Sequence, residues 1–113
     1  VTFVPHLLPL NRGILATIYV KKAQSAKAGK AQNLISLYKK FYKKEPFIRI
    51  RDEGDFPTIK DVVRTNFCDI GIKESADSII IIAAIDNLLK GAAGQAVQNM
   101  NIMYKFPEYT ALL

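Results

Sequence analysis

Seven consecutive apolar residues, Ile79 to Ile85, constrain the fold of this chain more than any other feature. Polar residues bound the run on both sides, with Ser78 before it and Asp86 after it. A membrane span needs about 18 apolar residues or more, so the run cannot cross a bilayer. It instead predicts a central strand that is covered on both faces.

The residues around this run predict further strands. Asn66 to Ile72 forms one strand, and the turn 73–76 would join it to the apolar run as an antiparallel hairpin. Runs of β-branched and aromatic residues indicate other strands. These expected strands are Val1–Val4, Ile14–Val20, Phe47–Arg51 and Lys60–Val63.

Two stretches have the spacing of amphipathic helices. The first repeats apolar side chains at helical intervals from Ala31 and ends near Lys44, just before a proline. The second begins after Asp86 or Asn87, both good N-caps, and continues to Met103. Strands in runs together with two long helices predict an α+β fold. We expect residues 1–113 to form a single domain with a mostly antiparallel sheet that is covered on one face by helices.

The positive charge is concentrated in one part of the chain. Residues 21–51 carry eight Lys and two Arg against one Glu, whereas the rest of the chain is net acidic. Segment 38–44 also interleaves aromatic residues with lysines, as single-strand nucleic-acid binders do. On a helix, however, the aromatics share the apolar side, which would face a core, and the lysines fall on other faces. We interpret the lysines as a solvated face, with nucleic-acid or phosphate contact as the alternative.

Several kinds of site are excluded by spacing or by composition. The six glycines never fall at Gly-x-Gly-x-x-Gly spacing, and Gly29-Lys30 is followed by Ala31 where a phosphate-binding loop needs Ser or Thr. One Cys and one His cannot build a structural zinc site, so we expect no metal. A lone cysteine also allows no disulfide framework, which fits a reducing compartment. The first residues lack the layout of a signal peptide, and we expect a cytoplasmic protein.

Two residues with reactive side chains have a structural interpretation and a functional one. Cys68 lies inside an expected strand, where a buried structural thiol is favoured over a nucleophile. His6 lies in a proline-bounded loop, where it could stabilise the turn or contact a ligand.

Gly91 and Gly94 also have two interpretations. Each glycine inside a helix costs about 1 kcal/mol relative to alanine, so a compensating contact is expected. One reading is close packing against another backbone. The other is a helix that begins near Gly91 and offers free N–H groups to a ligand. Gln95, Gln98 and Asn99 lie on adjacent turns, and their amides could bind a carboxamide or another polar substrate. The residues alone do not choose between these readings.

Four blocks, in order along nearly the whole chain, resemble the C-terminal part of the N-acetyl-gamma-glutamyl-phosphate reductase family. That family is similar in design to aspartate-semialdehyde dehydrogenase. The blocks are residues 5–19 (PHLLPLNRGILATIY), 41–47 (FYKKEPF), 66–70 (NFCDI) and 84–101 (AIDNLLKGAAGQAVQNMN).

The resemblance implies an NADPH-dependent reduction of an acyl phosphate to an aldehyde in arginine biosynthesis. It implies a GAPDH-like C-terminal domain, of which this chain would be the later part together with a closing helix. In the family a cysteine thiolate displaces phosphate and a histidine handles protons. Neither Cys68 nor His6 matches those motifs, so we expect no catalytic residue in this chain. The nucleophile segment and the Rossmann domain would lie upstream of Val1, and the fragment alone should be inactive.

The resemblance also implies which residues bind ligands. It places the loop from His6 to Gly13 near the active site, with His6, Asn11 and Arg12 as substrate-binding candidates. Arg12 could pair with a phosphate or carboxylate, or it could simply form a local ion pair. The cofactor-binding candidates, which would contact NADP, are Gly91, Gly94, Gln95 and Asn99.

The resemblance implies two partners: the N-terminal dinucleotide-binding domain of the same enzyme and further copies of the chain. An open sheet with only two helices leaves an apolar face uncovered, and this face is a plausible dimer surface. No membrane and no nucleic acid are expected as partners. The alternatives are a stand-alone basic nucleic-acid-binding module and a domain that only dimerises.

Overall fold

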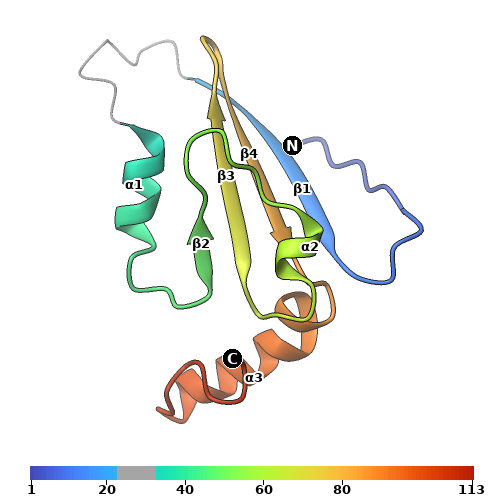
Figure 1. Ribbon diagram of the computed structural model, residues 1–113, viewed down its shortest axis with the longest axis vertical. Helices are drawn as coiled ribbons and strands as arrows, with labels where there is room; N and C mark the ends of the chain where they lie inside the picture. The colour runs from blue at the N-terminus through green and yellow to red at the C-terminus, as the bar shows by residue number, and fades with distance from the viewer. Residues whose placement is uncertain (23–32) are drawn as a thin grey trace.

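The computed structural model of the protein describes residues 1–22 and 33–113. Four strands form one sheet, and helical segments lie around it (Figure 1). The strands are β1 (Ile14–Lys21), β2 (Ile48–Ile50), β3 (Cys68–Glu74) and β4 (Ser78–Ile85). The helical segments are α1 (Leu34–Phe41), α2 (Ile59–Val62), the π-helical turn η1 (Leu89–Ala93) and α3 (Gly94–Met103).

The sheet has the order β1-β4-β3-β2, with β4 between its two antiparallel neighbours β1 and β3. Only β2 pairs in parallel, along β3. The predicted α+β fold, the mostly antiparallel sheet and the β3–β4 hairpin are therefore confirmed. The apolar run is central in the sheet, as expected, but its coverage on both faces is not observed. Within the described residues only Ala84 of β4 is fully buried, and the others are half-exposed.

Two short predicted strands are wrong. Val1–Val4 is exposed and pairs with no described strand, because the sheet ends at β1. Lys60–Val63 is not a strand either, because residues 59–62 form the helix α2. The Asp61 carboxylate accepts hydrogen bonds from the backbone N–H and the hydroxyl of Thr58, which caps this helix.

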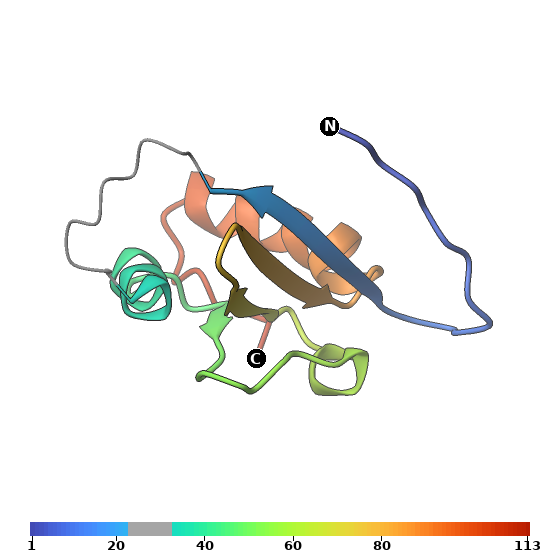
Figure 2. The same ribbon diagram turned by 90° about the horizontal axis from the view of Figure 1, so that it is seen from above.

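The helices cover the sheet only in part. α2 contacts β3 and β4, while α1 lies beside the edge strand β2. Viewed from above, α2 and α3 lie to different sides of the sheet (Figure 2). Most residues of β1 are exposed and most residues of β4 are half-buried, so much of the sheet is open in the described chain.

The helix α1 is shorter than predicted. The expected start at Ala31 lies outside the described residues, and Asn33 caps the observed helix by accepting a bond from the Ser36 N–H. The helix ends at Phe41, three positions before Lys44. None of its residues is buried, and Phe41 is 76% exposed. The expectation that its aromatic side chains face a core is therefore not met within the described chain.

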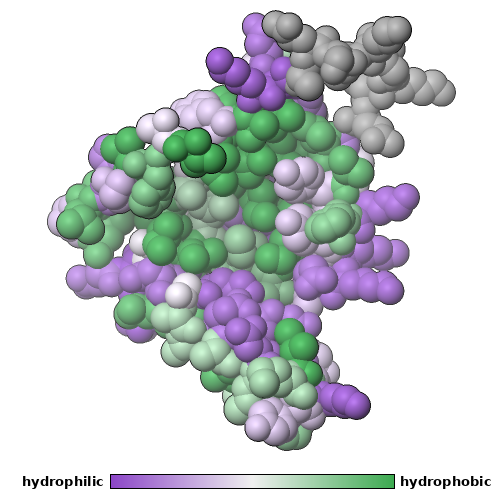
Figure 3. All heavy atoms as spheres, turned by 180° about the vertical axis from the view of Figure 1, so that it is seen from behind, coloured by the Kyte–Doolittle hydropathy of each residue, from purple (hydrophilic) through white to green (hydrophobic). Residues whose placement is uncertain are grey.

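Because side chains alternate along each strand, the register gives the sheet one face that is almost entirely apolar and one face that mixes charged with apolar side chains. We call the second the charged face, after the ion pairs that it carries. Ile18 of β1 pairs with Ile81 of β4, which pairs with Ile72 of β3, so these three share one face. Viewed from behind, apolar side chains gather over the sheet (Figure 3). We call this side the apolar face. Its isoleucines and valine include Ile14, Ile18, Val20, Ile70, Ile72, Ile79, Ile81 and Ile85.

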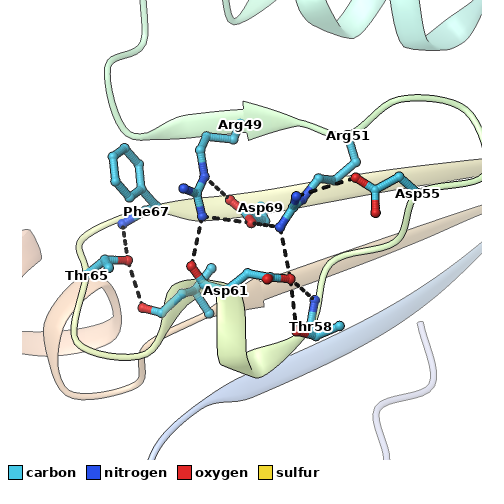
Figure 4. Close-up of polar contacts among 9 residues, drawn as sticks. Arg49, Arg51, Asp55, Thr58, Asp61, Thr65, Phe67 and Asp69 are labelled. Atoms are coloured by element: carbon cyan, nitrogen blue, oxygen red, sulfur yellow. Dashed lines mark hydrogen bonds and ion pairs between the residues drawn. The ribbon is translucent and has the colours of Figure 1, made fainter.

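The opposite face carries a network of ion pairs around Asp69, which is fully buried (Figure 4). Arg49 donates to both of its carboxylate oxygens, and Arg51 donates to Oδ2 at 2.7 Å. Arg51 also pairs with Asp61 of α2 at 2.9 Å, while the guanidinium of Arg49 lies 4.2 Å from the centre of the Phe67 ring. The network joins β2, β3 and α2, and the two arginines satisfy the buried carboxylate of Asp69.

Candidate functional site

A buried carboxylate stands where β4 ends and the C-terminal helical segment begins. Asp86 is 0% exposed and accepts four hydrogen bonds. Arg12 Nη1 donates at 3.1 Å, and the remaining donors are backbone N–H groups at 2.8–2.9 Å. Those N–H groups belong to Arg64, Leu88 and Leu89. One side chain therefore joins the N-terminal loop, the segment after α2 and the start of η1.

The hydrogen bonds fix the charge state of this carboxyl. Burial by itself penalises the charged form and raises the pKa of Asp86. The three backbone N–H groups and the Arg12 guanidinium stabilise the carboxylate by more, so the pKa falls from 3.8 to about 2. Asp86 is thus an anion whose charge is satisfied inside the protein.

The next residue holds the same loop by a second bond. Asn87 Oδ1 accepts the backbone N–H of Gly13 at 2.8 Å. Gly13 has φ +115°, and a Cβ at this position would stand 2.3 Å from the side chain of Ile59. Only glycine combines this backbone conformation with so close a contact. The entry to β1 is therefore fixed between Asn87 and α2.

A backbone hydrogen bond joins Gly91 to Asp86. Its N–H donates to the Asp86 carbonyl at 3.0 Å, and the helical segment already begins at Leu89. The second interpretation of the glycines, a helix that begins near Gly91 with free N–H groups, is therefore wrong. Gly91 itself is exposed, and its backbone stays open to contact. Asp86 thus bonds to both predicted ligand segments: to the loop through its carboxylate and to Gly91 through its carbonyl.

Gly94 packs closely, as the first interpretation of the glycines predicts, but its nearest contact is a side chain and not another backbone. It is buried, and a Cβ there would lie 2.2 Å from Oδ1 of Asn66. The Asn66 amide in turn donates to Gln98 at 3.0 Å, and Lys90 donates to the same Gln98 oxygen at 2.7 Å. Glycine at position 94 lets α3 approach the segment before β3.

Gln95 and Asn99 lie on the more exposed side of α3. Gln95 Nε2 donates to Asn99 Oδ1 at 2.8 Å, so the two amides form a pair. Each side-chain amide has one polar atom that takes no part in this bond. The Gln95 oxygen is an acceptor, and the Asn99 nitrogen is a donor. A carboxamide needs this combination of partners.

Two predicted substrate-binding residues line an open hollow. Asn11 and Arg12 form one side of it, and α2 with the segment after it forms the other. That second side supplies Lys60 and Arg64, which the sequence analysis did not single out. The spacing Thr58-x-x-Asp61, a capping-box pattern, was the available signal that a helix would place Lys60 here.

His6 does not line this hollow. His6 is exposed, and its Nδ1 lies 3.2 Å from the Val4 carbonyl within the same loop. Cys68 lies in β3 and is half-buried. Burial raises the pKa of the Cys68 thiol, nearby Lys90 opposes this and Asp69 adds to it, which favours the unreactive protonated form. Residues 1–22 and 33–113 contain no cluster of His, Cys, Asp and Glu that could hold a metal ion.

The helices of the described chain are all too short or too polar to cross a bilayer.

Residues 1–87 match the family described as "Semialdehyde dehydrogenase, dimerisation domain". This match covers more than half of the chain, and the protein belongs to this family of dimerisation domains.

Curated relatives carry a more specific name. The chain is 53% identical over 114 residues to the N-acetyl-gamma-glutamyl-phosphate reductase of Geobacter sp. (strain M21). It is 50% identical over 115 residues to the protein of the same name from Staphylococcus saprophyticus, and 49% over 114 residues to that of Staphylococcus aureus (strain USA300). The alignments cover 99–100% of this chain and 32–33% of those relatives. The predicted resemblance is confirmed, and the chain spans about a third of the length of these relatives.

The pKa of Asp86 predicts an acid-dependent loss of stability. Because the folded value is lowered to about 2 from 3.8, the ionised carboxylate contributes about 2 kcal/mol above pH 4. This contribution is lost as the pH falls from 4 through 2. The substitution Asp86→Asn should therefore lower the free energy of unfolding most at neutral pH, with the difference from the wild type shrinking toward pH 2. Urea unfolding at several pH values measures this.

Asn87→Ala is the matched control. It removes the bond to Gly13 without removing a titratable group, so its effect should not change with pH. A difference between the wild type and Asp86→Asn that stays constant from pH 7 to pH 2 would contradict the assignment.

Proposed function

We propose that this chain is the later part of the substrate and dimerisation domain of an N-acetyl-gamma-glutamyl-phosphate reductase. The whole protein would use NADPH to reduce N-acetylglutamyl 5-phosphate to the semialdehyde in arginine biosynthesis, in the cytoplasm, with release of phosphate. The observation that carries this proposal is about 50% identity to relatives of that name over 99–100% of the chain. Residues 1–113 would act together with a dinucleotide-binding domain of the same enzyme. The fragment alone would be inactive.

Substrate binding would use the loop that Asp86 and Asn87 hold. Arg12 gives one nitrogen to Asp86, and its planar fork has further N–H groups for a phosphate or carboxylate. Asn11 lines the same hollow, which supports a role beside Arg12. His6 would reach substrate only through a different conformation of the exposed loop.

Cofactor binding would use the exposed side of η1 and α3. NADPH would supply the hydride. The paired amides of Gln95 and Asn99 suit its carboxamide, because one acceptor and one donor remain. Gly91 would allow close approach to the helix backbone, and Gly94 would act indirectly by holding α3 against Asn66.

The nucleophile would come from another part of the whole protein. Cys68 is a poor candidate, since its pKa is raised mainly by burial and it sits inside β3. The residues of this chain would therefore orient substrate and cofactor, without forming the thioester themselves.

Kinetics of the intact protein test this proposal. It should oxidise NADPH in the presence of the acyl phosphate, and Arg12→Lys should raise the KM for the acyl phosphate about tenfold, because the planar fork is lost. Cys68→Ala is the control and should keep kcat within about twofold. No NADPH oxidation by the intact protein, or loss of activity in a folded Cys68→Ala variant, would overturn the proposal.

We also propose that the apolar face of the sheet packs against a second copy of the chain. The family is described as a dimerisation domain, and this face exposes Ile14, Ile18 and Val20 by 41–47% in the single chain. Apolar area of this kind is favourably buried in an interface between copies.

Substitutions on opposite faces of β1 test the dimer surface. Ile18→Asp places a charge on the apolar face and should shift the protein toward monomers in sedimentation velocity. Tyr19→Asp is the matched control, because Tyr19 belongs to the same strand, points to the other face and is 74% exposed. Dimers that persist in the first variant, or that are lost equally in both, would contradict this surface.

A further inference from the structure

The hollow beside Asp86 is lined by three cations and no carboxylate. Arg12, Lys60 and Arg64 all line it, and its other lining residues are apolar side chains and Asn11. Lys60 and Arg64 form no ion pair within residues 1–22 and 33–113. Asp86 is fully buried behind the hollow and already has four donors, so it cannot meet a ligand there. The opening is therefore positive.

The carboxylate nearest in sequence to Lys60 does not neutralise this charge. Asp61 bonds to Thr58 and pairs with Arg51, within the network on the charged face of the sheet. Residues 23–32, which the structure does not describe, include no Asp or Glu. Arg12 already pairs with Asp86, and an anionic ligand is the partner that Lys60 and Arg64 lack within the described chain.

The backbone of Arg64 gives a second, independent indication. Arg64 has φ +63°, in the left-handed region that costs free energy for a residue with a Cβ. The Arg64 N–H donates to Asp86 at 2.8 Å, and glycine would supply the same N–H without strain. The backbone role therefore does not require arginine. An arginine side chain at a strained position beside two other cations points to a use for the guanidinium.

We propose that Arg64, together with Lys60 and Arg12, binds the phosphate group of an anionic ligand in this hollow. The identity of the ligand rests on the proposed function, in which the acyl phosphate, the released phosphate and NADP all carry such a group. The positive charge and the backbone strain do not depend on that function. Arg64 presents a planar fork that matches phosphate oxygens, and Lys60 adds a point charge.

The substitution Arg64→Gly removes the guanidinium and should leave the fold intact. It keeps the N–H that bonds to Asp86 and relieves the strained φ, so the variant should fold and melt at a higher temperature than the wild type. The matched control is Lys105→Gly, because Lys105 also has a left-handed backbone, with φ +61°, but does not line the hollow. Both variants lose one positive charge and one strained residue.

Stabilisation of the intact protein by inorganic phosphate is the first readout, since a ligand that binds the folded state raises the Tm. Phosphate should raise the Tm of the wild type and of Lys105→Gly equally, at an ionic strength held constant with chloride. Arg64→Gly should weaken the apparent phosphate affinity about tenfold, and Lys60→Gln should weaken it in the same direction. Equal phosphate effects in Arg64→Gly and Lys105→Gly would overturn the proposal.

Kinetics then identify the source of the phosphate group. In the reverse direction, from aldehyde to acyl phosphate, Arg64→Gly should raise the KM for inorganic phosphate if the hollow serves the reacting phosphate. A rise in the KM for NADP instead would assign the site to the cofactor, and either rise supports phosphate binding. An intact protein without reductase activity that still shows the phosphate effect would refute the proposed function and leave this site standing.

Discussion

The arrangement of this domain depends on one buried anion, the carboxylate of Asp86. Four donors from three separate segments surround it, and each would lose its charge-assisted bond if the carboxylate were removed. The position of Asp86 is itself fixed, because it directly follows the central strand β4. The sheet therefore sets where the anion stands, and the anion sets where the loop and the helical segment meet.

This order of dependence connects stability with the proposed chemistry. Arg12 is held at the rim of the hollow through its bond to Asp86, while the carbonyl of the same residue holds Gly91. A substrate loop and a cofactor-facing helix would thus share one rigid support, as preorganised sites require. The ion pairs around Asp69 extend through Arg51 to Asp61 of α2, and they so fix the helix that carries Lys60. The apolar face of the sheet stays open for the proposed contact with a second copy.

The sequence predicted those features that depend on neighbouring residues. The apolar run predicts the central strand, and the turn after β3 predicts the hairpin. Asp86 and Asn87 are both predicted caps of the next helix, and it is Asp86 that accepts bonds from the N–H groups of Leu88 and Leu89. The bond from Arg12 to Asp86 could not be predicted, because 74 positions separate them and no periodicity reports such a pair. Lys60 and Arg64 are not among the predicted site residues, because β-propensity predicts a strand over residues 60–63 where the structure has α2. The strand expected at Val1–Val4 failed because β-propensity needs a neighbouring strand to pair with.

A double-mutant cycle on Arg12 and Asp86 tests the central role of this anion most directly. The variants Arg12→Met, Asp86→Asn and the combination of both would be unfolded in urea at pH 7. A charge-assisted bond that is buried at its acceptor predicts a coupling free energy of about 2 kcal/mol, with the double variant losing less than the sum of the single variants. Strictly additive losses would contradict the account, because the loop would then be held independently of Asp86.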